Sequence, residues 1–437
     1  MKKEKMMSLV LAIILTCAPI SGCADVSATI KIVDVNAREL QRPEPGGKSD
    51  AAAIAARGAN DFAFRLSAEL VNRGGDANFI CSPYSVWMPL AALASATNED
   101  NRDALLTALG APGISADELN GAASRMLYDL TGARFQGFAM EAGGRYKSPL
   151  QIANAIFVDR DVTMKTDFAQ AFADFYRGSA MNVDFESRGA VDAVNNWASE
   201  KTDGLIFDIV QEFDPRTVAA IANSVYFSGK WSWKFNADKT VEDVFYSPNG
   251  ETRAFYMLRE GDSQTYYEDE RVQTISMGFE NVGGMVILLP KDGDANGFLA
   301  SMTTDYFEEI QNDGIMATGK LLLPRFSIES GVMRLNDALI SLGVPLFDEE
   351  AAPLTGGLIE ENIPVWLESA AQRAVIEVDE EGVTAAAVTV LAMNGAGMPV
   401  QTEPFEMNCN SPFVFVLYGY TFDGGAQVLF TGVVNEP

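Results

Sequence analysis

Uninterrupted apolar runs in the second half of the chain are the feature that most limits its fold. Such runs occupy residues 285–289, 321–323, 413–418 and 428–430. A strand with one wet face alternates apolar and polar residues, whereas a strand buried on both faces does not. These runs therefore predict several buried strands. The first of them ends at Pro290, and Val433 and Val434 extend the last.

The first half of the chain shows helical spacing instead. Phe62, Leu66 and Leu70 recur every four residues, directly after the segment Ala59-Asn60-Asp61. Asn is a preferred helix N-cap, so this pattern predicts a helix that begins near Asn60. With helices mainly early and strands mainly late, we expect an α+β fold, with helices around large, mostly antiparallel sheets.

Charge and composition exclude several functions. The 437 residues carry 60 acidic and 32 basic side chains, a formal net charge of −28. Nucleic acid is therefore not expected as a partner, because phosphate binding needs clusters of Lys and Arg. The chain contains no histidine, which excludes Ser-His and Cys-His catalytic pairs and every His-bound metal site.

The sequence contains no complete motif for catalysis or for binding a metal or a cofactor. Residues 292–297 begin like a calcium-binding EF-hand loop, but the twelfth position, which needs a bidentate carboxylate, is Thr303. We interpret this segment as a turn and helix cap. No Ser-x-x-Lys pair, P-loop or dinucleotide-binding glycine pattern occurs. We therefore expect no enzymatic activity, no metal and no cofactor.

The N-terminus is typical of an exported lipoprotein. Residues 1–22 combine an early cluster of lysines with a short apolar run that ends in Ile-Ser-Gly before Cys23. This ending resembles the lipobox of bacterial lipoproteins, in which the cysteine is acylated after cleavage. The alternative is an ordinary secretory signal with a chance cysteine. We expect a cell-surface or secreted protein that contacts a membrane only through a lipid on Cys23.

Three segments follow from this interpretation. Residues 1–22 are the expected signal peptide, 23–52 a tether rich in Pro and Gly near residues 43–47, and 53–437 one folded domain. Two cysteines, Cys81 and Cys409, lie within the domain. Two cysteines do not form a disulfide framework, so we expect buried free thiols, with a single bridge as the alternative.

The segment 382–402 is unusual because it carries no charge in an otherwise acidic chain. It follows a strand-like run and the acidic residues Asp379, Glu380 and Glu381. Read with period two, one of its faces is uncharged and mostly small or apolar from Val383 to Met393. Such a segment could enter a sheet without burying a charge. The alternative is an ordinary buried strand followed by a turn.

Several segments together resemble the serpin family of protease inhibitors. Residues 377–387 are similar to the hinge of inhibitory serpins, and 407–417 to the C-terminal signature of the family. Further similar segments are 78–85, 194–197 with 202–204, 223–231, 323–326 and 342–344. The resemblance covers roughly residues 55–437. It implies the serpin fold with an exposed reactive loop.

The resemblance also implies a mechanism and its residues. A protease would cleave the reactive loop, whose freed hinge would then insert into the main sheet of a metastable inhibitor. The implied hinge residues are Glu380, Glu381, Gly382, Val383, Thr384, Ala385, Ala386 and Ala387. The implied residues of the shutter and breach, two regions of the main sheet that open for insertion, are Ser82, Ser85, Asn223, Trp231 and Gln372.

Three positions depart from the usual pattern of the family. Val383 replaces a commoner Thr, Val388 is bulkier than the usual Ala, and Gln372 stands where most members have His. A glutamine can donate and accept hydrogen bonds, so we expect a shutter link near Asn223 in altered form. The alternative function is a non-inhibitory serpin that acts as a cleavable substrate or binding protein.

The resemblance places the scissile bond between Ala396 and Gly397, sixteen residues after Glu380, with Met393 and Met398 as alternatives. No Lys or Arg follows Arg373. A trypsin-like pocket would therefore keep its buried Asp unpaired, whereas a small alanine suits the narrow pocket of elastase-like or subtilisin-like enzymes. We expect a monomeric inhibitor of such extracellular serine proteases.

Overall fold

The computed structural model describes residues 30–32, 35, 37–38, 40, 50–131, 150–201, 209–214, 216–280, 283–383, 403–421 and 425–437. Its α-helices are α1 (Asp50–Gly74), α2 (Pro83–Leu93), α3 (Glu99–Ala108), α4 (Ala116–Leu130), α6 (Thr166–Tyr176), α7 (Arg188–Lys201), α8 (Ala295–Ala300), α9 (Thr304–Asp313) and α10 (Asn336–Ser341). Among the described residues, no helix is both long and apolar enough to cross a membrane.

The strands form three sheets. A six-stranded sheet has the order β1 (Ile30–Ile32), β4 (Gly178–Val183), β3 (Leu150–Asp159), β5 (Ala219–Phe227), β14 (Ala370–Gln372), β13 (Met333–Arg334). A four-stranded sheet has the order β12 (Phe326–Glu329), β15 (Val375–Val378), β16 (Gly382–Val383), β6 (Gly229–Lys230). Because β6 follows β5 and β15 follows β14 after short gaps in the chain, these two sheets are the halves of one split sheet.

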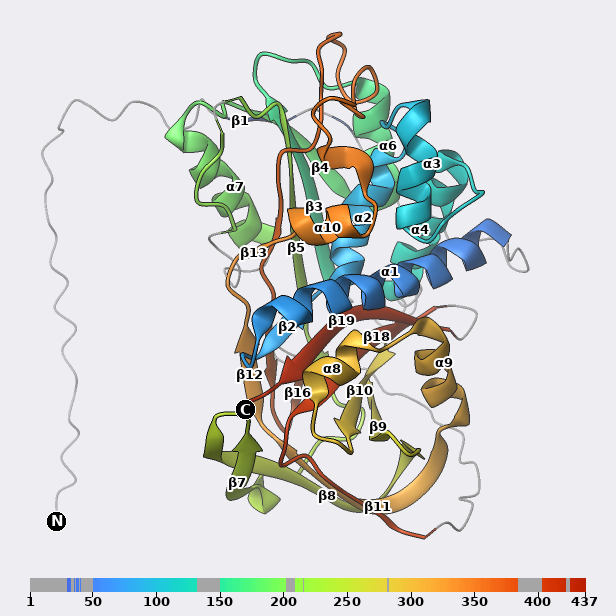
Figure 1. Cartoon of the computed structure of the whole chain (residues 1–437), viewed down its shortest axis with the longest axis vertical. Coiled ribbons are helices and arrows are strands. Elements are labelled where there is room, and N and C mark those ends of the chain that lie inside the picture. The colour runs from blue at the N-terminus through green and yellow to red at the C-terminus, as the bar shows by residue number, and fades with distance from the viewer. Residues whose placement is uncertain are drawn as a thin grey trace, which may run out of the picture.

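The third sheet is the largest. Its order is β17 (Phe405–Asn408), β11 (Ile315–Pro324), β8 (Gly250–Glu268), β9 (Val272–Phe279), β10 (Gly283–Pro290), β18 (Phe413–Tyr420), β19 (Ala426–Val434), β2 (Phe79–Cys81), and β7 (Val241–Ser247) pairs with β8. Figure 1 shows α1 crossing the middle of the molecule, between this sheet and the upper group of helices. The predicted α+β class is confirmed, and most strand pairs are antiparallel, with parallel pairs such as β3 with β4.

All four predicted strands are present, but only three of the apolar runs are fully buried, because Leu322 of β11 is half-buried between the buried Leu321 and Leu323. Every residue of β10 is buried, and so is every residue of β18 except Tyr420. These strands lie next to each other in antiparallel register, with Val286 opposite Val416. The prediction of a helix cap at residues 292–297 is also confirmed, because Asp294 Oδ1 accepts a 2.8 Å hydrogen bond from the backbone of Gly297 at the start of α8.

The predicted helix start near Asn60 is wrong. Helix α1 begins at Asp50, and Asn60 lies in its interior, where it is only 6% exposed. Its Nδ2 donates to the carbonyl of Ala426 at 2.9 Å, and its Oδ1 accepts from Gln427 Nε2 at 2.6 Å and from the backbone of Val428 at 2.8 Å. The side chain that suggested a cap therefore attaches the helix to β19.

Part of the expected tether belongs to the folded body. Ile30–Ile32 forms β1 and pairs antiparallel with β4, with Ile30 opposite Val183. Asp50 to Ala52 already belong to α1. The rest of the division into signal peptide, tether and domain stays a prediction, and Cys23 lies outside the described residues. The expectation for the other thiols is confirmed, because Cys81 and Cys409 are both buried and free.

Candidate functional site

The candidate site is the base of the segment 384–402, where the chain leaves the split sheet. Strand β16, which contains Gly382 and Val383, lies between β15 and β6. Val383 is opposite Val378 on one side and Gly229 on the other. The first residues of the uncharged segment therefore already occupy a central strand position.

Gly382 is required at this entry point. Its φ is +151°, and a Cβ atom there would lie 2.2 Å from the carbonyl oxygen of Gly229. Only a residue without a side chain allows the backbone of β16 to approach β6 this closely. The glycine is therefore explained by its position in the sheet.

Among the described residues, the two halves of the split sheet are poorly closed next to β5. Strand β5 pairs with β3 along its whole length, from Ala219 to Phe227. On its other side, β14 pairs with it in parallel at only two positions, Ile221 and Ala222. Backbone groups on this side of β5 beyond Ala222 have no β14 partner, which is the situation in which an added strand can form a ladder.

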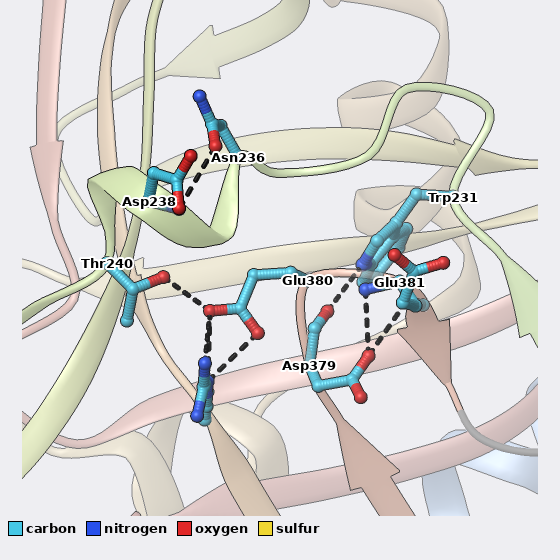
Figure 2. Close-up of polar contacts among 9 residues, drawn as sticks. Trp231, Asn236, Asp238, Thr240, Asp379, Glu380 and Glu381 are labelled. Atoms are coloured by element: carbon cyan, nitrogen blue, oxygen red, sulfur yellow. Dashed lines mark hydrogen bonds and ion pairs between the residues drawn. The ribbon is translucent and has the colours of Figure 1, made fainter. Parts of the chain in front are cut away.

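Glu380 is held firmly just before β16. Arg325 donates to it in a bidentate arrangement, with Nε at 2.9 Å from Oε2 and Nη2 at 2.7 Å from Oε1, and Thr240 Oγ1 donates to Oε1 as well. Figure 2 shows the Thr240 hydroxyl directed at this carboxylate. Burial raises the pKa of Glu380, but the hydrogen bonds from Arg325 and Thr240 outweigh it and hold that pKa below its ordinary value.

Trp231 fixes the turn between β15 and β16. Its indole N–H donates to the carbonyl of Asp379 at 2.9 Å, and its backbone N–H donates to the carbonyl of Glu381 at 3.0 Å. The indole is 1% exposed and stacks on Phe279 with ring centroids 4.7 Å apart. Asp379 closes the turn, because its Oδ1 accepts from the backbone of Glu381 at 2.8 Å (Figure 2).

Three of the predicted shutter residues, Gln372, Ser82 and Ser85, are brought together, but Gln372 forms no hydrogen bond with Asn223. Its Oε1 accepts from the backbone of Ser82 at 2.9 Å, and its Nε2 donates to the carbonyl of Ser82 at 2.9 Å and to Ser85 Oγ at 2.7 Å. Asn223 instead donates to Asn154 on β3 at 2.5 Å. The polar link thus runs from β14 to the start of α2 instead of to Asn223.

The remaining predicted site residues lie outside the described residues. They are the hinge residues Thr384, Ala385, Ala386 and Ala387, the proposed scissile pair Ala396 and Gly397, the alternatives Met393 and Met398, and Cys23. Within the described part of the chain, no group of three or more His, Cys, Asp or Glu side chains could hold a metal ion. The described part of the site thus consists of paired strands and the side chains that hold them in place.

Sequence reasoning missed several residues that hold the site. Arg325 and Thr240 hold Glu380, and Lys234 forms an ion pair with Glu381. Arg325 lies inside one of the segments that matched the family pattern, so its position was marked but its partner was not. The contact joins residues 55 positions apart, which no local pattern reports.

Comparisons with known proteins agree on one family. A family model described as "Serpin (serine protease inhibitor)" matches residues 57–437. An uncharacterised serpin-like protein of Thermococcus kodakarensis is 29% identical over 396 residues, covering 86% of this chain and 84% of the relative. Antichymotrypsin-2 of Bombyx mori is also 29% identical, over 86% of this chain and 97% of its own.

Solved structures show the same fold. The native state of Tengpin, a thermophilic serpin, aligns with a TM-score of 0.73 and 25% identity, covering 91% of this chain and 97% of that structure. Serpin48 of the insect Tenebrio molitor aligns with a TM-score of 0.74 and 24% identity, over 90% of this chain and 100% of that structure.

Proposed function

Because this chain belongs to the serpin family, which is described as serine protease inhibitors and not as enzymes, we propose that it is a suicide-type inhibitor of extracellular serine proteases. The proposal rests above all on β16, whose two residues occupy the position between β15 and β6 that a longer inserted strand would extend. Insertion would then continue a ladder that has already begun.

The register of β16 predicts which residues of β15 and β5 each hinge residue would face after insertion. Continuing the pairings of Val383 one for one places Ala385 opposite Ile376 and Phe227, and Ala387 opposite Ala374 and Val225. Like Val383, which is 4% exposed, these alanines would point to the buried face. Small uncharged side chains can enter this position without burying a charge or overfilling the core.

The proposed mechanism uses the protease's own chemistry. Its catalytic serine attacks the carbonyl carbon of residue 396, the bond to Gly397 breaks, and the nitrogen of Gly397 leaves as a new amino terminus. Residue 396 remains joined to the serine as an ester. Insertion of the freed strand then carries the protease along the sheet and distorts its active site before water hydrolyses the ester.

Full insertion must open the parallel pair of β14 with β5. The same register places Thr389 opposite Asn223 and Gln372, immediately before the paired residues Ala222 and Ala371. Gln372 holds β14 on α2 through three hydrogen bonds, so these bonds set part of the barrier to insertion.

A denaturing gel after incubation with a protease panel tests the proposal. We expect a complex that resists denaturant with the wild-type chain and clean cleavage without a complex for Ala387→Glu, which would bury a charge. Ala386→Glu is the matched control, since its charge lies on the other face of the strand and should largely preserve the complex. Clean cleavage of the wild-type chain would instead identify a non-inhibitory serpin that acts as a substrate.

We further propose that the targets are elastase-like or subtilisin-like. The small Ala396 suits a narrow apolar pocket. In a larger pocket, each methylene that the side chain lacks weakens binding by about 1 kcal/mol. Mass spectrometry of the released fragment should place the cut after Ala396, and trapping of trypsin should be negligible. A cut outside 393–399, or faster trapping of trypsin than of elastase, would overturn this assignment without affecting the insertion mechanism.

Surface anchoring through Cys23 is a separate proposal, based on the lipobox-like segment before it. Cys23→Ser should remove the lipid and leave a folded domain, because the residue precedes the described fold. Partitioning between detergent and aqueous phases measures the difference. Equal partitioning of both forms into the aqueous phase would contradict anchoring and favour an ordinary secreted protein.

A further inference from the structure

A polar cavity of about 490 Å³ lies where the N-terminal turns of α3, α4 and α6 meet the loop 355–357. Figure 1 shows these three helices grouped at the upper right of the molecule. A volume of this size is typical of small-molecule sites, whereas one water in the liquid occupies only about 30 Å³. None of the described hinge, shutter or breach residues lines the cavity, so the proposed inhibition leaves it without a role.

Two cations line the cavity without a carboxylate partner in the described part of the chain. Arg102 donates through Nε to the carbonyl of Ala94 at 3.1 Å and through Nη2 to the carbonyl of Thr97 at 2.7 Å. Lys165 Nζ donates to the carbonyl of Gly356. A guanidinium has five N–H donors and an ammonium group has three, so both side chains keep donors for a ligand.

Three carboxylates line the same cavity, each in the first turn of one helix. They are Glu99 of α3, Asp117 of α4 and Asp167 of α6, and all three are exposed. No ion pair between described residues joins any of them to Arg102 or Lys165. A ligand of one sign would be repelled by the charges of that sign, whereas a ligand that carries both signs can pair with each set.

A buried amide also faces this space. Asn120 of α4 lines the cavity and is 4% exposed. Its Oδ1 accepts a 2.8 Å hydrogen bond from the hydroxyl of Tyr176, whereas its Nδ2 forms no hydrogen bond within the described chain. The Nδ2 group is therefore available to a carboxylate or a peptide carbonyl. Phe168, which is 6% exposed, adds an apolar surface for a small aliphatic side chain.

We propose that this cavity binds a small aliphatic zwitterion, either a free amino acid or a dipeptide. Arg102, Lys165 and Asn120 Nδ2 bind its carboxylate, and the three acidic side chains bind its ammonium group. The two candidate ligands share this chemistry, because both carry opposite charges at the ends of a short, mostly apolar body.

A line of hydrogen bonds connects the cavity to the main sheet. Tyr176 donates to Asn120 through its hydroxyl, and its carbonyl accepts from Asn154 Nδ2 at 3.1 Å. Asn154 Oδ1 in turn accepts from Asn223 Nδ2 at 2.5 Å. Asn223 is the residue of β5 that the register of β16 places opposite Thr389 after insertion. The cavity is therefore connected to the position that an inserting strand would reach.

The loop 355–357 belongs to the segment that leads to β14. The backbone N–H of Lys165 donates to the carbonyl of Leu358 at 3.0 Å, so this segment and α6 meet at the cavity. A ligand held by both would tie the segment before β14 to α6, which is hydrogen-bonded to β3. Insertion must separate β14 from β5, so we expect the bound zwitterion to slow trapping. This effect rests on the proposed function, but the binding itself does not.

Isothermal titration calorimetry of the full chain tests binding, with L-alanine and dialanine as probes. We expect saturable binding of at least one of them, and the comparison identifies the preferred ligand. N-acetyl-L-alanine lacks the ammonium group and L-alaninamide lacks the carboxylate, so each should bind about tenfold more weakly or worse. Equal binding of either analogue, or no saturable binding of both zwitterions, would overturn the proposal.

A pair of double variants assigns the binding to the cavity. Asp117→Asn with Asp167→Asn removes two of the lining carboxylates and should weaken binding by about tenfold or more. Asp100→Asn with Asp103→Asn is the matched control, because both residues are exposed on α3, remove the same charge and do not line the cavity. Equal affinities of the two double variants would contradict the site.

Tyr176→Phe separates binding from its effect on inhibition. Tyr176 does not line the cavity, so the variant should still bind the zwitterion, but it lacks the hydroxyl that bonds Asn120. The zwitterion should slow protease trapping by the wild-type chain and leave the rate of the variant unchanged. Equal slowing of both, or none in the wild type, would contradict the coupling. If the wild-type chain trapped no protease at all, the proposed function would fail, and the calorimetry would still decide the site.

Discussion

At the scale of single residues, a few buried polar side chains position the elements that matter for function. Asn60 makes three hydrogen bonds to β19, and Gln372 makes three to the start of α2. Each satisfies backbone groups that would otherwise be buried without partners. Glu380 is the corresponding residue at the hinge, and because its carboxylate titrates, its contribution to stability depends on pH.

Glu380→Gln should destabilise the native state by about 1–2 kcal/mol at neutral pH, because it removes the charge from a bidentate pair whose Arg325 side chain is 46% exposed. The folded pKa of Glu380 lies below its ordinary value, so the stabilisation is present above the unfolded pKa and is lost as pH falls through the folded pKa. Urea unfolding at neutral and acidic pH should show the two proteins converging in acid.

Glu381→Gln is the matched control for this prediction. Its partner Lys234 is 43% exposed and the Glu381 side chain is 65% exposed. Exposed pairs of this kind contribute little, so the unfolding midpoint should change far less than in Glu380→Gln. Equal effects of the two substitutions at neutral pH would show that burial and bidentate geometry do not determine the contribution of Glu380.

At the scale of elements, helix α1 is placed by close backbone contact as well as by side chains. A Cβ atom on Gly58 would lie 2.1 Å from the carbonyl oxygen of Gly110, which follows α3 and has a φ of +72°. The helix and the turn after α3 therefore touch through two glycines. The helical propensity of the sequence around Gly58 gives no hint of this contact, because a glycine in a helix interior is locally unfavourable.

Gly58→Ala and Gly121→Ala should have opposite effects, although both place alanine inside a helix. At Gly58 the clash with backbone should cost about 1–3 kcal/mol despite the better helix propensity of alanine. At Gly121 in α4 nothing lies within 4 Å of the added Cβ atom, so stability should rise by about 0.5–1 kcal/mol. Chemical denaturation of both variants measures the difference. Effects of the same sign would contradict the contact between α1 and the turn.

The strands could be predicted better than the helices for a physical reason. A strand buried on both faces, such as β10, must be continuously apolar, and that run is visible in the sequence. The start of α1 was predicted ten residues too late because Asn60 has the side chain of a cap but is used in a tertiary contact. Local chemistry alone does not distinguish the two uses.

At the scale of the whole molecule, the split sheet is the defining feature. In its six-stranded half, β14 pairs with β5 at only two residues, and in its four-stranded half, β16 lies between β15 and β6. Under the proposed mechanism, a further strand that fills this opening lowers the free energy, so the native state would be metastable.

Cleavage within 384–402 should therefore raise the temperature of unfolding, because it frees the segment to pair with β5 and β15. Scanning calorimetry of the intact and the cleaved chain measures this. The cleaved Ala387→Glu variant should show a smaller rise, because its charge opposes insertion. An unchanged unfolding temperature of the wild-type chain after cleavage would contradict insertion, even if the chain still slowed a protease by simple competition.

The sequence by itself determined the fold class, the buried strands and the location of the uncharged segment, because apolar runs and missing charges are local properties. Its motifs also indicated the family, which the match of the family model to residues 57–437 confirms. Only the tertiary structure decided that β16 already lies between β15 and β6 and that Arg325 holds Glu380. It also decided that Gln372 forms its hydrogen bonds with the start of α2 and not with Asn223. These contacts join distant parts of the chain, so their geometry depends on how the sheets and helices pack together.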